Sequence, residues 1–451
     1  MASFSFDRAM GLVLLLLTVT LSLMMLRSPG TSDVSIVLNW ADILHQNGLI
    51  RGYSEVISDL HTEYPPISHA MLYIARALGN TVGLSPLGSF KVIILAFQLM
   101  SAGIILVLSG SYWVAAAFNA SIFLSGVGLG YQDVWFAPPL ILAFWAFRAG
   151  RDVLGTALFL IACLTKWQPL IVAPFIAVYL FDISNFRSCR DVLGRRLFWQ
   201  LAILIAMTIA LLLLIFGLSP VRSLWHGMNH PFWSGTALNL PWVGEFFCKV
   251  FFPSFYQQMV VGSAQKIPLL SSYFFSQQDQ LKFLLPPAVY LLPLKIFFWS
   301  LLIVVVIRAM RSKKTFTNCM LFSIAGLVTY TIWNSGVHEN HLFVAMVLAF
   351  MLLLHEHTRE HWAIVTVLAV MLNVNLFVFY GVTGAQLQSP VVGVDLSGIM
   401  AMLYVVVWLF LVVYVWGLKG ESTNVEKEIH LPEMVVNRLF ARRRRFFVTF
   451  T

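Results

Sequence analysis

The chain has 451 residues, of which 59% are hydrophobic and only 11% are charged. A soluble domain has about 25% charged residues, so the composition excludes a soluble protein and predicts an all-α, polytopic membrane protein. The net charge of +9 does not indicate nucleic acid as a partner. Much of the basic charge lies in short clusters between apolar segments, where it sets the orientation in the membrane.

Candidate membrane spans follow one another along the whole chain, since a span needs roughly 20 apolar residues and about 17 are enough. About twelve are predicted: 10–26, 89–108, 112–129, 134–148, 152–166, 169–183, 197–216, 289–308, 317–334, 341–355, 361–380 and 397–417. Residues 1–418 are therefore expected to form one transmembrane helix bundle, followed by a basic cytoplasmic tail, 419–451. The first segment lacks a small-x-small cleavage site, so we expect a retained helix rather than a signal peptide.

Four basic clusters predict the orientation, because with twelve spans all of them fall on the same, cytoplasmic face. They are Arg148 with Arg151, Arg187 to Arg196, Arg308 to Lys314, and Arg442 to Arg445. Two long connections, 27–88 and 217–288, then fall on the opposite, outer face. Both are too apolar to be free linkers, and we expect them to carry helices that lie in the membrane interface, one of them over 34–50.

The first outer connection contains Asp33, one of only 20 acidic residues in the chain. Acidic side chains this close to a bilayer are often functional. The alternative is that Asp33 caps the N-terminus of the interfacial helix. Later in the same connection, Glu63-Tyr64-Pro65-Pro66 predicts a rigid turn that leads into a helix, because proline fixes φ and suits a first helical turn.

Two shorter connections carry polar residues to the same outer face. In Tyr131-Gln132-Asp133, the acid either marks a water-exposed turn or belongs to a site. In Thr165-Lys166-Trp167-Gln168-Pro169, the Lys166 ammonium either extends to lipid headgroups or contacts a phosphate.

The segment Gly336-Val337-His338-Glu339-Asn340-His341 enters the tenth predicted span, where polar side chains are costly unless they face protein or water. His338 and His341, three residues apart, are expected on one helix face. The H-E-x-x-H spacing of a zinc site is missing, so hydrogen bonding to an anionic group is favoured over metal binding. The later histidine-rich segment, 355–361, falls on the cytoplasmic face and is predicted to be a solvated connector.

The order of these motifs resembles the GT-C glycosyltransferases, integral membrane enzymes that use polyprenyl-phosphate sugars. The resemblance spans about residues 10 to 355 and is nearest to dolichyl-phosphate glucosyltransferases and bacterial mannosyltransferase-type relatives. It implies that Asp33 is the catalytic carboxylate and that Asp133 belongs to the second acidic motif. It also implies that Lys166, His338 and Glu339 lie near the donor phosphate. Three features depart from the pattern: Asp33 is not part of a D-x-D pair, Gln132 precedes Asp133, and Asn340 follows His-Glu.

We therefore expect a membrane enzyme that transfers mannose or glucose from a polyprenyl-phosphate donor to an acceptor hydroxyl on a glycan, a lipid-linked glycan or a protein. Asp33 would act as general base at the extracytoplasmic or lumenal face, with inversion at the anomeric carbon. Side chains expected to contact substrate are Trp40, Glu63, Tyr64, Gln132 and His341. No cofactor is expected, and a divalent metal is not favoured. The membrane would be the plasma membrane in a bacterium and the endoplasmic reticulum in a eukaryote. The alternative is a secondary transporter or lipid flippase, although transporters place polar sites near the midplane.

Overall fold

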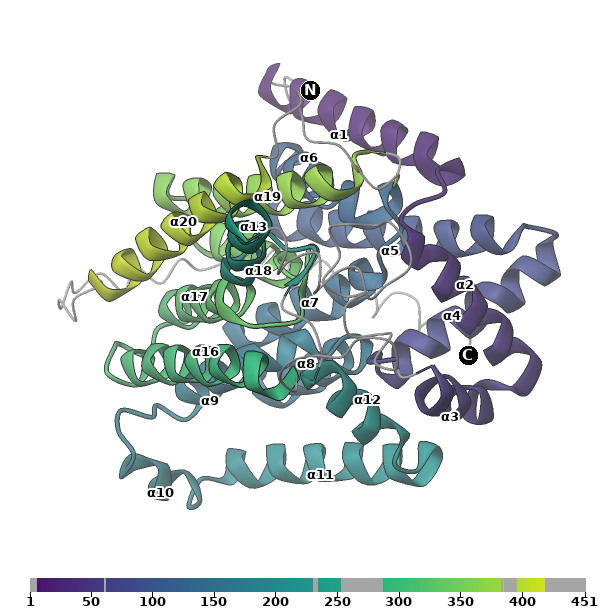
Figure 1. Cartoon of the computed structure of the whole chain (residues 1–451). Coiled ribbons are helices and arrows are strands. Elements are labelled where there is room, and N and C mark those ends of the chain that lie inside the picture. Colours follow the sequence, from purple (N-terminus) through teal and green to yellow (C-terminus); the bar gives the residue numbers. More distant parts are fainter. Residues whose placement is uncertain are drawn as a thin grey trace, which may run out of the picture. The chain divides into compact units, whose positions relative to one another are not determined.

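The computed structural model describes residues 6–60, 62–229, 234–252, 287–382, 384 and 396–417 (Figure 1). Among them, seven helices are long and apolar enough to cross a membrane. These are α1 (Phe6–Met24), α5 (Pro86–Ser109), α11 (Arg196–Phe216), α16 (Pro287–Met310), α17 (Phe316–Trp333), α19 (Arg359–Tyr380) and α20 (Ser397–Gly417). The protein is therefore an all-α, multi-pass membrane protein, as its composition predicts. The predicted tail, 419–451, lies outside the described residues.

Shorter helices occupy the other five predicted spans. They are α6 (Tyr112–Ser121), α7 (Ala137–Arg148), α8 (Asp152–Thr165), α9 (Ala173–Leu180) and α18 (Phe343–His355). Single 3-10 turns, η3 (Gln132–Phe136) and η4 (Gln168–Val172), lead into α7 and α9, and a one-turn helix, α10 (Ser188–Val192), precedes α11. Because proline lacks an N–H donor and suits a first turn, Pro138, Pro169 and Pro174 fit where these elements begin.

The core of the bundle lies around α17 and α18. Within the most apolar 18-residue stretch of each helix, 78% is buried in α17 but only 6% in α11. In α18, every residue from Phe343 to Leu353 is buried. Edge-to-face aromatic pairs join α18 to its neighbours, with Phe118 and Phe350 at 5.0 Å and Phe136 and Phe343 at 5.3 Å between ring centroids. Figure 1 shows α1 and α11 at opposite edges of this bundle, where their apolar side chains remain exposed.

The predicted span over 112–129 is wrong as a continuous helix. It divides after α6 into a π-helical turn, η2 (Leu124–Gly128), with non-helical backbone at Gly126. The freed backbone groups are bonded by buried side chains of α5: Lys91 Nζ donates to the carbonyls of Val127 at 2.6 Å and Gly128 at 3.1 Å, and Gln98 Oε1 accepts from the Val127 N–H. Irregular backbone is tolerated in a membrane protein where protein groups satisfy it in this way. The break brings Tyr131 and Asp133 into a buried loop.

The basic clusters within the described residues contact the ends of neighbouring helices. Arg148 donates to the carbonyl of Leu354 at 3.4 Å, and Arg308 donates to that of Trp416 at 2.8 Å. Phe181, Val192 and Leu201 pack together and hold the connection between α9 and α11 at the same end as Lys314. The common, cytoplasmic face of these clusters stays a prediction. The fourth cluster, Arg442 to Arg445, lies outside the described residues.

Both long connections, 27–88 and 217–288, contain helices. The first forms α2 (Ser32–Asn47), α3 (Leu49–Asp59) and α4 (Pro66–Val82), and the second contains α12 (Ser219–Met228) and α13 (Leu240–Phe251). The helix predicted over 34–50 ends early, because Gly48 adopts φ +76° and turns the chain between α2 and α3. The predicted proline turn is confirmed: Pro65 is the N-cap of α4 and Pro66 is its first residue.

Candidate functional site

Lys166 joins three distant segments of the chain. It directly follows α8, and its Nζ atom donates to the Tyr64 hydroxyl at 2.9 Å and lies 3.5 Å from Oδ1 of Asp133. Burial alone would lower the pKa of Lys166, but Asp133 and Tyr64 raise it above its usual value. The side chain is buried, so Lys166 forms an internal ion pair; the alternative that it extends to lipid headgroups is wrong.

Asp133 lies fully buried in the 3-10 turn before α7. Asn340 Nδ2 donates to its Oδ2 atom at 2.5 Å. Burial raises the pKa of Asp133, and the Lys166 ammonium opposes that rise. A buried charge is stable only when it is paired and hydrogen-bonded, so Asp133 is not the mark of a water-exposed turn. It fixes Lys166 and Asn340 in one place.

Glu339 is the second buried carboxylate. It accepts hydrogen bonds from the hydroxyls of Tyr131 and Thr236. Burial raises the pKa of Glu339 to about 8, and the nearby Asp33 carboxylate adds to the rise, while the two hydroxyls oppose it. With a pKa of about 8, Glu339 is largely protonated at neutral pH, and the Thr236 hydroxyl that bonds it also bonds the Gly235 carbonyl.

A short parallel pairing holds the Glu339 segment. Strand β1 (Ser234–Gly235) of the second long connection pairs with β2 (Val337–His338). Asn375 of α19 clamps the same junction, because its side chain accepts from the Leu238 N–H at 2.8 Å and donates to the Glu339 carbonyl at 2.7 Å. The buried amide of Asn375 therefore connects the non-helical segments that contain Leu238 and Glu339.

The prediction that the two histidines lie on one helix face is wrong, because α18 begins only at Phe343. His338 belongs to β2, and its ring packs so closely on Gly235 that a Cβ there would lie 2.8 Å from Nδ1. His341 stacks on Tyr330 and shares a 3.2 Å hydrogen bond with its hydroxyl. The rings of the two histidines still lie 5.4 Å apart. The tight turn, rather than helical spacing, brings them together.

Asp33 lies in the first turn of α2 but is not its cap, since the N-cap residue is Thr31. Its side chain is exposed, and no side chain among the described residues hydrogen-bonds to it. Protein nevertheless crowds around it and raises the pKa of its carboxyl; Glu63 adds to that rise and Lys166 opposes it. An accessible carboxylate with a raised pKa, near both buried networks, is available to accept a proton.

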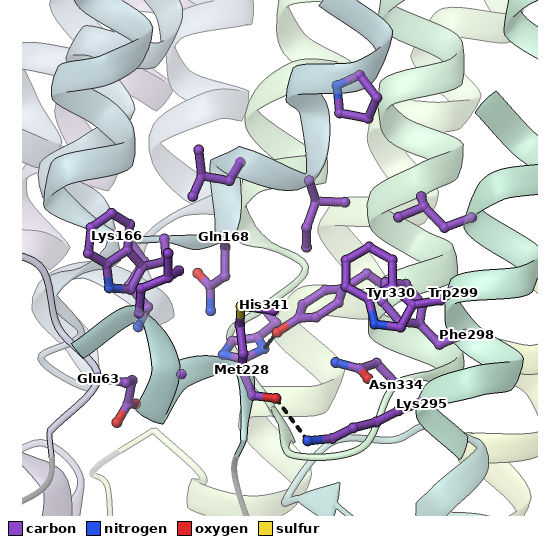
Figure 2. A pocket seen from close by; sticks show the side chains of 17 residues that line it. Glu63, Lys166, Gln168, Met228, Lys295, Phe298, Trp299, Tyr330, Asn334 and His341 are labelled. Atoms are coloured by element: carbon purple, nitrogen blue, oxygen red, sulfur yellow. Dashed lines mark hydrogen bonds between the residues drawn. The ribbon is translucent and has the colours of Figure 1, made fainter. Parts of the chain in front are cut away.

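An adjoining cavity of about 290 Å³ opens between η4, α9, α12, α16 and α17 (Figure 2). Polar side chains lie along one part of its wall, and apolar side chains from α9 and α16 continue the wall away from them. Figure 2 shows Lys166, Gln168 and His341 around the polar part, with Phe298 and Trp299 on the opposite side. The Gln168 side chain is buried, and its Oε1 atom has no partner among the described residues. The remaining lining residues are Glu63, Trp167, Leu170, Ile171, Pro174, Leu224, Gly227, Met228, Lys295, Leu302, Tyr330 and Asn334.

The structure brings most of the predicted site residues near one another, but only some of them line the cavity. Glu63, Lys166 and His341 line the cavity, whereas Asp33, His338 and Glu339 lie outside its lining. Trp40 is buried against Tyr64, with ring centroids 5.6 Å apart. Gln132 accepts a hydrogen bond from Ser68. Neither Trp40 nor Gln132 lines the cavity.

Sequence reasoning missed four residues of the site: Gln168, Thr236, Lys295 and Asn375. Gln168 lies in the segment Thr165 to Pro169, but a glutamine on its own does not indicate a site. Asn375 and Lys295 lie within apolar spans, where a polar residue normally faces protein or a cavity. That rule could have marked both.

Glu339→Gln is expected to reduce the pH dependence of stability. Because the folded-state pKa of Glu339 is raised from 4.5 to about 8, its stabilising protonated form is fully present below pH 4.5. That stability is lost as the pH rises toward 8. Glutamine reproduces the neutral form. Melting temperatures at pH 5 and pH 8 should therefore differ less in the variant than in the wild type, with Glu55→Gln on α3 as control. Equal slopes in both proteins would contradict the assignment.

No group of three or more His, Cys, Asp or Glu side chains within the described ranges could hold a metal ion.

No protein-family model matches the chain, and no curated protein matches it either.

Proposed function

We propose that the protein is a membrane glycosyltransferase that transfers a hexose from a polyprenyl-phosphate donor to an acceptor hydroxyl on the extracytoplasmic or lumenal face. The bundle would cross the membrane twelve times, with the shorter helices completing the count. The observation that carries the proposal is the cavity, whose polar part adjoins Lys166 and His341 and whose apolar wall continues along α9 and α16.

A polyprenyl-phosphate sugar matches this wall in its chemistry. Its isoprenoid chain is apolar and its phosphate is anionic, so one end of the lipid suits Ile171, Leu302 and Trp299 while the other suits cationic and hydrogen-bonding groups. Trp299 is 48% exposed, which leaves that side of the cavity accessible from the region that lipid would occupy. A soluble sugar nucleotide would gain nothing from such a wall.

The reaction would be a single displacement. The acceptor oxygen forms a bond to the anomeric carbon, the bond from that carbon to the phosphate oxygen breaks, and polyprenyl phosphate leaves with the electron pair. Asp33 takes the hydroxyl proton, which its raised pKa favours. Cationic and N–H groups at the polar end of the cavity stabilise the negative charge on the leaving phosphate. Attack from the face opposite the phosphate inverts the anomeric configuration.

The neutral Glu339 has a supporting role in this scheme. If it were ionised, its negative charge would disfavour the ionised form of Asp33, which is the form that accepts the hydroxyl proton, because two close carboxylates do not both carry charge readily. Protonated Glu339, which is bonded to Tyr131 and Thr236, carries no such charge. Mannose and glucose are the proposed sugars, and the acceptor is a glycan, a lipid-linked glycan or a protein.

Purified protein incubated with a panel of polyprenyl-phosphate hexoses and acceptor glycans tests the proposal. The expected result is a product one hexose heavier than the acceptor, detected by mass spectrometry, together with free polyprenyl phosphate. A lipid flippase or transporter would instead move an unchanged substrate across a sealed vesicle. That outcome, without any hexose transfer, would replace the proposed function with the alternative.

A further inference from the structure

Lys295 gives α16 a polar end facing the cavity. Lys295, Phe298, Trp299 and Leu302 all line it, and their spacing of three, four and seven residues places them on one face of a helix. One face therefore begins with an ammonium group and continues as an apolar strip. Leu170, Ile171 and Pro174 form the apolar wall contributed by η4 and α9. Together the two walls suit a lipid with one anionic end.

The described hydrogen-bond partners of Lys295 are uncharged oxygens. Its Nζ atom donates to the backbone carbonyl of Met228 at 2.8 Å and approaches Asn229 Oδ1 at 3.5 Å (Figure 2). No carboxylate among the described residues pairs with it. Lys166 differs, because Asp133 lies 3.5 Å away and neutralises it inside the protein. An anion in the cavity would therefore gain more from Lys295 than from Lys166.

The position of Glu63 also favours Lys295 over Lys166 as the contact of an anion. Figure 2 shows Glu63 beside Lys166, on the side of the cavity opposite Lys295. A phosphate beside Lys166 would meet this carboxylate, whereas a phosphate beside Lys295 would lie away from it. Like charges brought together in a partly buried site are costly.

We propose that Lys295 is the principal phosphate-binding residue of the cavity and that its ligand is a polyprenyl phosphate with the chain lying along Phe298, Trp299 and Leu302. This inference rests on the proposed function and deepens it, because it replaces Lys166 as the main phosphate contact. Binding would draw the ammonium from the Met228 carbonyl at the end of α12 to the phosphate oxygens. Lys166 then acts as a structural cation that holds Tyr64 and Asp133 together.

Equilibrium binding of a long-chain polyprenyl phosphate and of the matching polyprenol to the full chain in phosphatidylcholine nanodiscs tests this assignment. Lys295→Gln is the decisive variant, because glutamine can still donate to the Met228 carbonyl but carries no charge. Its affinity for the phosphate should fall by about 10- to 100-fold, with polyprenol binding unchanged. Lys295→Arg should retain the preference for phosphate. Inorganic phosphate at millimolar concentration should not displace the lipid, because it lacks the chain.

Lys314→Gln is the matched control, since its Nζ atom also donates to a carbonyl of α16, that of Met310 at 2.7 Å, but lies outside the cavity lining. Full phosphate preference in Lys295→Gln would overturn the inference and leave the proposed function standing. If only Lys166→Met lost the preference for polyprenyl phosphate over polyprenol, the inference would also be overturned and the proposed function would stand. A wild-type protein that binds polyprenol and polyprenyl phosphate equally would overturn both. Displacement by inorganic phosphate would identify a free anion as the ligand and contradict the lipid assignment.

Discussion

Replacing Asp33 with asparagine is expected to reduce the rate of hexose transfer by about 10²- to 10⁴-fold, the usual contribution of a general base. Asparagine keeps the size and polarity of the side chain but cannot take up the hydroxyl proton. Because Asp33 has no hydrogen-bond partner among the described side chains, the substitution leaves no buried group unpaired. The fold and the binding of donor lipid should therefore be unchanged. Initial rates at saturating donor measure the effect.

Asp42→Asn is the matched control for this variant. Asp42 lies on the same helix, α2, but its carboxylate pairs with Arg76 at 2.5 Å, and surface pairs of this kind contribute about 0 to 1 kcal/mol. Its transfer rate should stay close to that of the wild type. A wild-type rate in Asp33→Asn would exclude Asp33 as the base. A loss of donor binding would instead make Asp33 a binding residue.

Replacing Lys166 with methionine is expected to lower the free energy of unfolding by about 3–5 kcal/mol, the usual cost of breaking a buried ion pair. The variant leaves Asp133 fully buried without its cation. The double variant Lys166→Met with Asp133→Asn removes both charges and should recover much of the loss. Denaturation in detergent, followed by tryptophan fluorescence, compares the three proteins. Equal stability of the single variant and the wild type would show that the pair has no structural role.

The stability of Lys166→Met should also depend on pH. Burial raises the pKa of Asp133, and the ammonium that opposes this rise is missing in the variant. A group whose folded-state pKa lies above its unfolded value stabilises the fold below the unfolded pKa, and that contribution is lost as pH rises. The variant should therefore melt at a higher temperature at pH 5 than at pH 8. The double variant should not show this difference.

The helical bundle follows from the sequence because membrane helices are apolar and satisfy their own backbone groups. A helix therefore lies in each predicted segment, and the proline turn at Pro65 and Pro66 follows from local geometry. The break at Gly126 could not be predicted in the same way. It depends on Lys91 and Gln98 reaching the freed carbonyl and N–H groups from another helix, and such contacts leave no periodic signal.

The candidate site was only partly predictable for the same reason. Motif order and shared sidedness indicated that Asp133 and Lys166 would lie on one face, and the structure brings them into contact. Hydropathy gave no reason to connect Asn375 or Lys295 to these motifs, because each lies in an apolar segment far away in sequence. The strand pairing of Gly235 with His338 is a long-range contact between two short loops, which local propensity cannot specify.

The anomeric configuration of the product tests the central proposal most directly. Purified wild-type protein would be supplied with a polyprenyl-phosphate hexose of defined anomer and a glycan acceptor, and the new glycosidic bond would be assigned by NMR. A single displacement with Asp33 as base predicts a product of inverted configuration. A product of retained configuration, or unchanged donor in the presence of folded protein and the full panel of acceptors, would contradict it.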